Sequence, residues 1–159
     1  MGHWFDLDEL DPELIKFAVV IAKYNNKFII IKNRKRGGWE IPGGNKEIGE
    51  TIVHTASREL YEETGAVRFE LTPYGVYEWN GSFGMVSYAE VKLLESLPES
   101  EIEEIKLVDE LPEGMNFGDM FYHFLDRWDG LENYEPKKYT IEINHLNELP
   151  VIKLIGKER

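Results

Sequence analysis

Apolar residues in this chain fall into short runs rich in β-branched and aromatic side chains, a pattern typical of β-strands. The expected strands span residues 14–24, 27–34, 39–42, 67–79, 84–95 and 104–111. Asn25–Asn26 and Asn80–Gly81 separate two neighbouring pairs of these runs, and such dipeptides favour tight hairpin turns. Gly43–Gly44 follows Pro42 and predicts a further turn.

Two other segments have the spacing of helices. Residues 51–64 contain neither Pro nor Gly, and Val53, Ala56 and Leu60 recur at helical intervals, so a helix is expected that ends at Gly65. Residues 117–128 carry aromatic side chains at the same intervals and predict a second helix. Its aromatic face fits core packing or a ligand platform, and core packing is the expectation.

The order of these elements predicts an α+β fold in which a mixed β-sheet is sandwiched between helices, an α/β/α arrangement. The chain has 159 residues, no internal repeat and no long linker, so residues 1–159 are expected to form a single domain. Its core is expected at about residues 15–130. Residues 131–159 form a C-terminal extension of unassigned role, in which 137–155 fit one or two strands, or an extended arm.

Composition excludes several classes of function. The chain has 18 Lys and Arg against 30 Asp and Glu, a net charge of −12, which argues against DNA as a partner. It has no cysteine, which excludes disulfides and zinc–thiolate sites. It has no apolar run long enough for a membrane span, and its acidic amino terminus is unlike a secretory signal, so a cytoplasmic location is expected.

One acidic cluster has a spacing that solubility does not require. On the expected helix, Glu59, Glu62 and Glu63 share one face beside the apolar stripe, with Arg58 as the nearby cation. A solvated face would normally interleave more Lys or Arg, and like charges one turn apart repel. Hard cations such as Mg²⁺ or Mn²⁺ prefer oxygen ligands and would relieve that repulsion. Gly44 allows the backbone to approach a bound ligand closely.

Residues 43–66, GGNKEIGETIVHTASRELYEETGA, resemble the signature of the Nudix hydrolases, Gly-x5-Glu-x7-Arg-Glu-U-x-Glu-Glu-x-Gly-U, in which U is a bulky aliphatic residue. The matching positions are Gly44, Glu50, Arg58, Glu59, Leu60, Glu62, Glu63, Gly65 and Ala66. All seven charged and glycine positions agree, and only Ala66 is smaller than the family pattern. The arrangement of strands and helices over roughly residues 15–130 is also similar to the Nudix fold.

The resemblance implies roles for individual residues. Glu62 and Glu63 would bind the metal directly, and Glu59 would bind metal or act as general base. The backbone carbonyl of Gly43 would be a further ligand. Arg58 would orient a glutamate, and Glu50 would form a supporting salt bridge. The implied cofactor is Mg²⁺ or Mn²⁺, which polarises a phosphoryl oxygen and activates water.

Members of the family often recruit another glutamate from a loop beyond the central strands. Glu104 is the first candidate here for a catalytic or metal-binding role, and Glu101 is the second. A plain acidic loop facing solvent is the alternative.

Candidate substrate contacts flank the motif. Arg34 and Arg36 lie in a basic loop just before it and suit phosphate binding, although they also fit ordinary solubilising charge. Asn116 and Phe117 precede the second expected helix. Family resemblance suggests that Asn116 reads a purine base, whereas its position also suits a helix cap.

The function expected from this resemblance is hydrolysis of a nucleoside triphosphate, such as an oxidised purine nucleotide of the 8-oxo-dGTP type, to a monophosphate and pyrophosphate. Two alternatives stay open. One is another substrate linked through a nucleoside diphosphate, such as a dinucleoside polyphosphate, a nucleotide sugar or capped RNA. The other is a non-catalytic nucleotide sensor. A small-molecule partner is expected, and a homodimer is left open.

Overall fold

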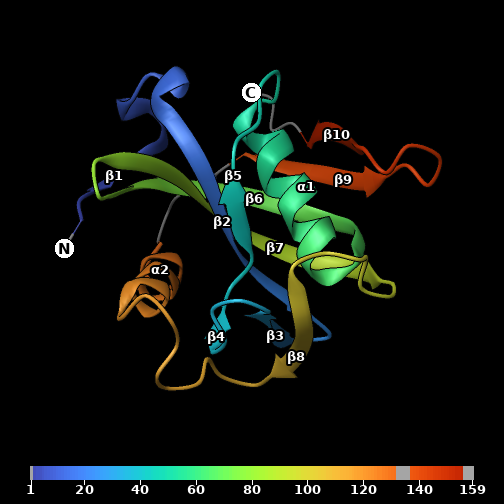
Figure 1. Ribbon diagram of the computed structural model, residues 1–159. Coiled ribbons are helices and arrows are strands. Elements are labelled where there is room, and N and C mark those ends of the chain that lie inside the picture. Colours follow the sequence, from blue (N-terminus) through green and yellow to red (C-terminus); the bar gives the residue numbers. More distant parts are fainter. Residues whose placement is uncertain (1, 132–136, 156–159) are drawn as a thin grey trace.

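Ten strands and two α-helices make up the computed structural model, which describes residues 2–131 and 137–155 (Figure 1). The strands are β1 (Trp4–Phe5), β2 (Ile15–Tyr24), β3 (Lys27–Asn33), β4 (Trp39–Glu40), β5 (Gly43–Asn45), β6 (Ala66–Trp79), β7 (Ser82–Leu94), β8 (Ile102–Val108), β9 (Lys138–Ile143) and β10 (Pro150–Ile155). The helices are α1 (Ile52–Thr64) and α2 (Met120–Asp129), with two 3-10 turns, η1 (Leu7–Glu9) and η2 (Pro12–Leu14).

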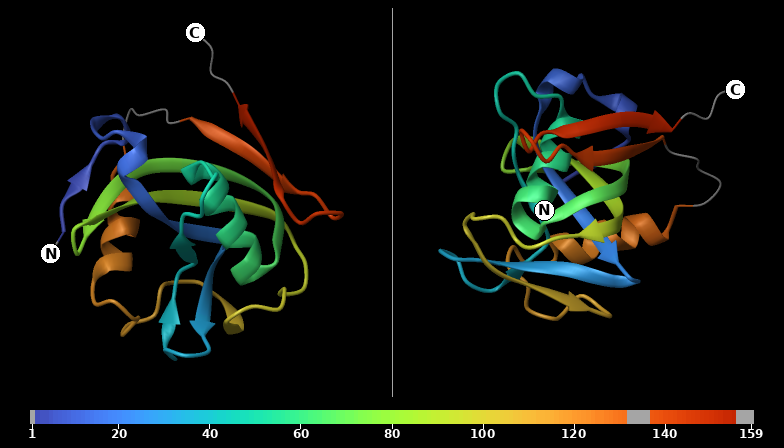
Figure 2. Two further views of the ribbon diagram at one scale, coloured as in Figure 1. Left: turned by 45° about the horizontal axis from the view of Figure 1, so that its top comes forward. Right: turned by 90° about the vertical axis from the view of Figure 1, so that its right-hand side faces the viewer.

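All ten strands join one mixed sheet with the order β10-β9-β6-β7-β2-β3-β4. Strands β1, β5 and β8 pair with β6, β2 and β3, respectively. Strands β2 and β7 pair in parallel, whereas the other pairs between described strands are antiparallel. The sheet curls strongly, so that it arches over α1 in the left-hand view of Figure 2. The mixed sheet expected from the sequence is confirmed.

The two helices cover opposite faces of this sheet. On β2, Ala18 and Val20 belong to the cluster that includes Leu60 of α1, whereas Val19 and Ile21 belong to the cluster that includes the aromatic residues of α2. Alternate residues of a strand point to opposite faces, so the sheet is sandwiched between the helices as expected. The aromatic face of α2 packs into the core, which confirms that prediction.

Both hairpin turns lie at the dipeptides that the sequence predicted. Asn25 and Asn26 have φ of 51° and 66°, and Asn80 and Gly81 have φ of 51° and 78°. Two successive residues with positive φ are characteristic of the turns that suit the twist of paired strands. Helix α1 begins after Thr51, whose side chain accepts a hydrogen bond from His54 N at 3.2 Å, and Gly65 ends it.

Several boundary predictions were wrong, among them that of β8, which covers Ile102–Val108 in place of the expected 104–111. The expected turn at Gly43–Gly44 is instead part of β5, because β2 offers hydrogen-bonding partners along Phe17–Val19. Helix α2 begins three residues later than expected, because Phe117 has a φ of 69°, outside the helical region.

The C-terminal extension adds two strands. Strand β9 pairs with Arg68–Leu71 of β6, and β10 forms the outer edge of the sheet. This chooses the two-strand alternative for residues 137–155, while 132–136 and 156–159 lie outside the described residues. Neither described α-helix has the length and apolarity needed to cross a membrane.

Ser87 in β7 is completely buried, and its hydroxyl has no hydrogen-bond partner within the described part of the chain. Because an unpaired buried hydroxyl is destabilising, Ser87→Ala is expected to raise the free energy of unfolding by about 1 kcal/mol, or Tm by about 2–4 °C. The matched control is Ser57→Ala. Ser57 is equally buried but donates to Val53 O at 2.8 Å, so its loss should not stabilise. Equal shifts in both variants by differential scanning calorimetry would contradict the prediction.

Candidate metal centre

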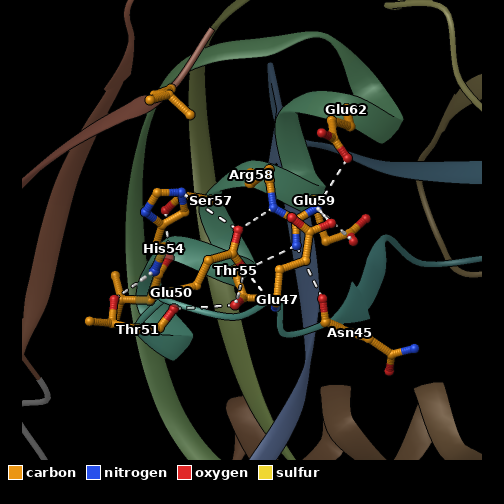
Figure 3. Close-up of polar contacts among 12 residues, drawn as sticks. Asn45, Glu47, Glu50, Thr51, His54, Thr55, Ser57, Arg58, Glu59 and Glu62 are labelled. Atoms are coloured by element: carbon orange, nitrogen blue, oxygen red, sulfur yellow. Dashed lines mark hydrogen bonds and ion pairs between the residues drawn. The ribbon is translucent and has the colours of Figure 1, made fainter. Parts of the chain in front are cut away.

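A buried ion pair between Arg58 of α1 and Glu50 of the preceding loop braces the motif (Figure 3). Arg58 Nε lies 2.5 Å from Glu50 Oε2, and Nη2 lies 3.1 Å from Oε1. Nη2 also donates to the backbone oxygen of Asn45 at 3.1 Å. This arginine therefore ties the helix to the loop that connects it to β5, and the supporting role expected for Glu50 agrees with this geometry.

The ionisation of this pair is strongly biased towards the charged forms. Burial opposes ionisation of Glu50, but hydrogen bonds from Arg58 and from the Thr55 hydroxyl at 2.7 Å outweigh it and lower the pKa of Glu50 to about 2. The hydrogen bond to Glu50 is also the main cause that raises the pKa of Arg58. Both groups are thus charged throughout the physiological range.

Arg58 also holds two of the expected metal ligands. Its Nη1 donates to Glu59 Oε2 at 3.1 Å and to Glu62 Oε1 at 3.2 Å (Figure 3). The Glu59 carboxyl group packs directly over Gly44, where a Cβ atom would lie only 2.2 Å from the carboxyl carbon. Gly44 therefore makes room for Glu59, and its expected contact with substrate stays a prediction.

Glu63 is partly buried against β5. Its Oε1 accepts a hydrogen bond from the backbone N–H of Gly43 at 2.9 Å. Burial raises the pKa of Glu63 to about 8, with further upward contributions from Glu59 and Glu40. Burial likewise raises the pKa of Glu59 to about 7, and Glu62 adds to that shift although Arg58 opposes it. The two partly buried carboxyl groups of Glu59 and Glu63 thus lie close together with too little positive charge nearby to keep both ionised.

A divalent cation fits this donor set. Within residues 2–131 and 137–155, no three acidic or His side chains already surround a common point, since Arg58 stands between Glu59 and Glu62. The oxygen-only chemistry of the cluster nevertheless suits Mg²⁺ or Mn²⁺. The added charge would also offset the crowding that raises the pKa of Glu59 and Glu63. Coordination by the Gly43 carbonyl stays a prediction.

The structure does not bring Glu104 to this cluster. Glu104 lies opposite Lys32 in the β3–β8 register, and its carboxylate is 3.6 Å from Lys32 Nζ. The neighbouring Ile105 packs against the cluster on the α1 side, so Glu104 points to the other face. In this structure Glu104 thus faces away from the cluster, because strand alternation depends on register, which the spacing of acidic residues does not reveal.

Glu101 lies nearer to the basic loop. Its backbone oxygen accepts from Arg34 N at 2.8 Å, and its charge is among those that raise the pKa of Arg36, after the hydrogen bond to Glu40. It is the better placed of the two loop candidates. A role in metal binding stays a prediction for it.

Arg36 of the basic loop pairs with Glu40, a residue that the sequence analysis did not single out. Arg36 donates to Glu40 through Nε at 2.7 Å and Nη2 at 2.9 Å, so much of its charge is neutralised within the protein. Arg34 makes a weaker contact, from Nη2 to Ile102 O at 3.4 Å. Of the two arginines predicted to bind phosphate, Arg34 therefore has the weaker side-chain hydrogen bonding to the protein. An acidic residue inside the apolar run at 39–42, four positions after an arginine, was the signal for Glu40.

Asn116 is not a helix cap, because α2 begins at Met120 and its N-cap is Asp119. Its side-chain amide instead donates to Gly37 O and Glu40 Oε2, each at 2.7 Å. The Phe117 ring lies over the Arg36 guanidinium, 5.5 Å away. The structure therefore brings the predicted substrate residues Arg36, Asn116 and Phe117 together around Glu40.

Comparison with known proteins relates most of this chain to one domain family. The sequence matches the NUDIX domain over residues 12–139. A MutT-like protein of Streptomyces ambofaciens is 35% identical over 74 residues, which cover 46% of this chain and 47% of that protein. A candidate 8-oxo-dGTP diphosphatase of Bacillus subtilis, YtkD, is 32% identical over 108 residues, which cover 64% of this chain and 66% of that protein. The matched part thus spans about half of the first relative and two thirds of the second.

Solved structures agree on the fold. A mutant of a Bacillus subtilis pyrophosphohydrolase superposes with a TM-score of 0.66 at 23% identity, over 82% of this chain and 93% of that chain. At this level of identity, the similarity shows the architecture alone.

Proposed function

Because the chain belongs to the NUDIX domain family, we propose that it hydrolyses a nucleoside triphosphate to a monophosphate and pyrophosphate with the help of a divalent metal. The observation that carries the proposal is the pair of partly buried carboxyl groups, Glu59 and Glu63, on a helix braced by Arg58 and Glu50. Such a pair is costly in a folded protein unless cations bind to it. All the charged positions of the family signature, Glu50, Arg58, Glu59, Glu62 and Glu63, are present in this chain.

Glu59, Glu62 and Glu63 would hold the metal, together with the carbonyl of Gly43. When bound, Mg²⁺ or Mn²⁺ supplies Lewis-acid polarisation of a phosphoryl oxygen and a more acidic water. The protein contributes orientation: Arg58 fixes Glu59 and Glu62 through one nitrogen, and Gly43 fixes Glu63. Glu59 would take one of two roles: a metal ligand, as above, or, when it is not bound to metal, the base that accepts the proton of the attacking water, for which its raised pKa of about 7 is suited.

The nucleobase would lie beside Asn116 and Phe117. Phe117 is 39% exposed and stands edge-on to Trp79, with ring centroids 6.5 Å apart, so an aromatic surface faces solvent there. Relatives named as MutT-like or as 8-oxo-dGTP diphosphatases favour a purine nucleotide, including an oxidised one. Another nucleoside diphosphate-linked substrate is the second candidate, because the family as a whole acts on such compounds.

A substrate panel tests this proposal. Pyrophosphate and phosphate release would be measured with Mg²⁺ or Mn²⁺ on canonical and oxidised nucleoside triphosphates, dinucleoside polyphosphates, nucleotide sugars and capped RNA. The expected result is pyrophosphate release from at least one triphosphate and none after EDTA treatment. Greater turnover of a diphosphate-linked compound would favour the second candidate. Nucleotide binding without turnover in either metal would overturn both in favour of a sensor.

A further inference from the structure

The hairpin formed by β9 and β10 gathers exposed apolar side chains at the outer rim of the sheet (Figure 2). Nine large apolar residues are exposed in the described part of the chain, and five of them lie within residues 146–155: Leu146, Leu149, Val151, Leu154 and Ile155. The other four are scattered over the chain: Leu14, Ile48, Leu107 and Phe117. Single exposed apolar side chains are common, whereas a group on one element is typical of a surface that binds another molecule.

Strand β10 also has a free backbone edge. It pairs with β9 along its whole length, Pro150–Ile155, and it is the last strand in the order of the sheet, so no described strand pairs with its other side. Backbone N–H and C=O groups on that side are available to a further strand. Pro150 lacks an N–H group, but the five residues after it do not. The edge can therefore accept an added strand over most of its length.

The hairpin is fixed in place on the rest of the protein. Strand β9 pairs with Arg68–Leu71 of β6, and Ile152 of β10 packs against the core cluster on the α1 side. Its loop is closed by hydrogen bonds from Glu148 N to Asn144 O at 2.7 Å and from Leu146 N to Asn144 Oδ1 at 2.8 Å. Because this edge is already ordered, a strand that docks on it loses only its own conformational freedom.

The charge of the hairpin permits a second copy of the same chain to approach. The whole chain has a net charge of −12, so most contacts between two copies would be repulsive. Residues 137–155 differ from this average, since they carry three lysines against two glutamates. Two copies that meet at β10 would thus bring together segments of nearly balanced charge.

Two-fold symmetry limits how two β10 strands can pair. In a symmetric antiparallel pair, one residue lies opposite its own copy. With Lys153 in that position, two ammonium groups would face each other, which is destabilising. With Ile152 there, Val151 lies opposite Lys153 of the second copy, and Pro150 lies opposite Leu154. The pairing centred on Ile152 therefore sets no like charges directly opposite each other.

This pairing also complements charge between the copies. Val151 lies opposite Glu142 in the β9–β10 register, so Glu142, Val151 and Lys153 of the second copy would follow one another across three strands on one face. The aliphatic part of that lysine can cover Val151 while its ammonium group extends towards Glu142. Glu142 has room for a second cation, because its carboxylate is 67% exposed and lies 3.7 Å from Arg68.

We propose that β10 is a docking surface for a second copy of this chain. The two β10 strands pair antiparallel about Ile152 and join the two sheets into one. The proposal concerns assembly, and it does not depend on the substrate or on turnover. Since the paired strands are short, the dimer belongs to the weak and reversible class, with a Kd on the order of 10 μM.

Sedimentation velocity and hydrogen exchange test the dimer directly. Wild-type protein is expected to be monomeric at about 1 μM and mostly dimeric at about 300 μM. Hydrogen–deuterium exchange at the same two concentrations should show that amides of residues 151–155 become protected in the dimer. A monomer at every concentration, or a dimer that leaves these amides unprotected, would overturn the proposal.

Val151→Lys tests the contact by adding charge. It sets a lysine opposite Lys153 in each of the two symmetric pairs, so the Kd of the dimer should rise by about tenfold or more. Val151 is 48% exposed, and Tm measured on the dilute monomer should confirm that the variant is folded. The matched control is Leu107→Lys in β8, where the original side chain is 37% exposed, and it should leave the Kd unchanged. Equal effects of the two substitutions would contradict the assignment to β10.

A charge exchange tests the register. Combining Val151→Lys with Lys153→Glu sets the introduced lysine opposite the introduced glutamate of the second copy, so the Kd should return towards the wild-type value. If position 153 instead lay opposite itself, the same double variant would set two glutamates against each other and the dimer would stay weak. Failure of the double variant to recover would therefore overturn the pairing about Ile152.

Discussion

Replacing Glu63 with glutamine is expected to reduce metal-dependent nucleotide hydrolysis by roughly 100- to 1,000-fold, the scale seen when one electrostatic stabiliser of a transition state is removed. Glutamine keeps the volume of the side chain and can still accept the hydrogen bond from Gly43, so the change removes mainly the charge. Because burial raises the pKa of Glu63 to about 8, the ionised carboxylate is disfavoured in metal-free protein. The variant should therefore melt at the same temperature as wild type, or higher.

Two measurements check this prediction together. Turnover with Mg²⁺ and Mn²⁺ should be lost, and the rise in Tm on adding either metal should shrink, because fewer ligands favour the bound state. Glu104→Gln is the matched control, since that carboxylate pairs with Lys32 on another face of the sheet and its loss should change turnover less than about twofold. Wild-type turnover in the Glu63→Gln variant would show that Glu63 is not part of the metal site.

Glu50→Gln is expected to lower the free energy of unfolding by on the order of 3 kcal/mol at pH 7. The substitution leaves the buried Arg58 guanidinium without its closest counter-ion, while Glu59, Glu62 and the more distant Glu47 remain as partners. Turnover should also fall, because Arg58 would no longer hold the metal-binding glutamates in one orientation.

The loss of stability in the Glu50→Gln variant is expected to depend on pH. The pKa of Glu50 is lowered from its ordinary value to about 2 in the folded state, so folded protein binds its proton later than unfolded protein as the pH falls. The stabilisation is present above about pH 4.5 and is lost as the pH falls towards 2. Urea unfolding at several pH values should therefore show a larger difference between wild type and Glu50→Gln at pH 7 than at pH 3. A difference that is constant with pH would contradict the ion-pair explanation.

Much of the candidate site could be predicted from the sequence because it is local. Glu59, Glu62 and Glu63 lie on one helix, so helical geometry alone places them on one face, and Thr51 and Gly65 mark where that helix begins and ends. The tight hairpin at Asn25–Asn26 is local in the same sense.

The parts that were missed depend on partners far away in the chain. Gly43–Gly44 has the composition of a turn, yet pairing with β2 makes it a strand. Glu104 has the right composition for a metal ligand, but its register against β3 turns it away. Glu40 is buried, and its hydrogen-bond partner Asn116 lies 76 positions away in the chain.

The parallel pairing of β2 with β7 has a consequence for how the protein folds. Strands β3, β4 and β5, helix α1 and strand β6 all lie in the chain between these two partners, so the central pairing of the sheet joins segments separated by most of the candidate metal centre. Pairing between strands that are far apart in the sequence slows folding, and the folding rate then depends on the segment that separates the two strands. Substitutions in the loop before α1 would then delay refolding as well as weaken catalysis, and the metal centre would not be expected to form in a fragment that ends before β7.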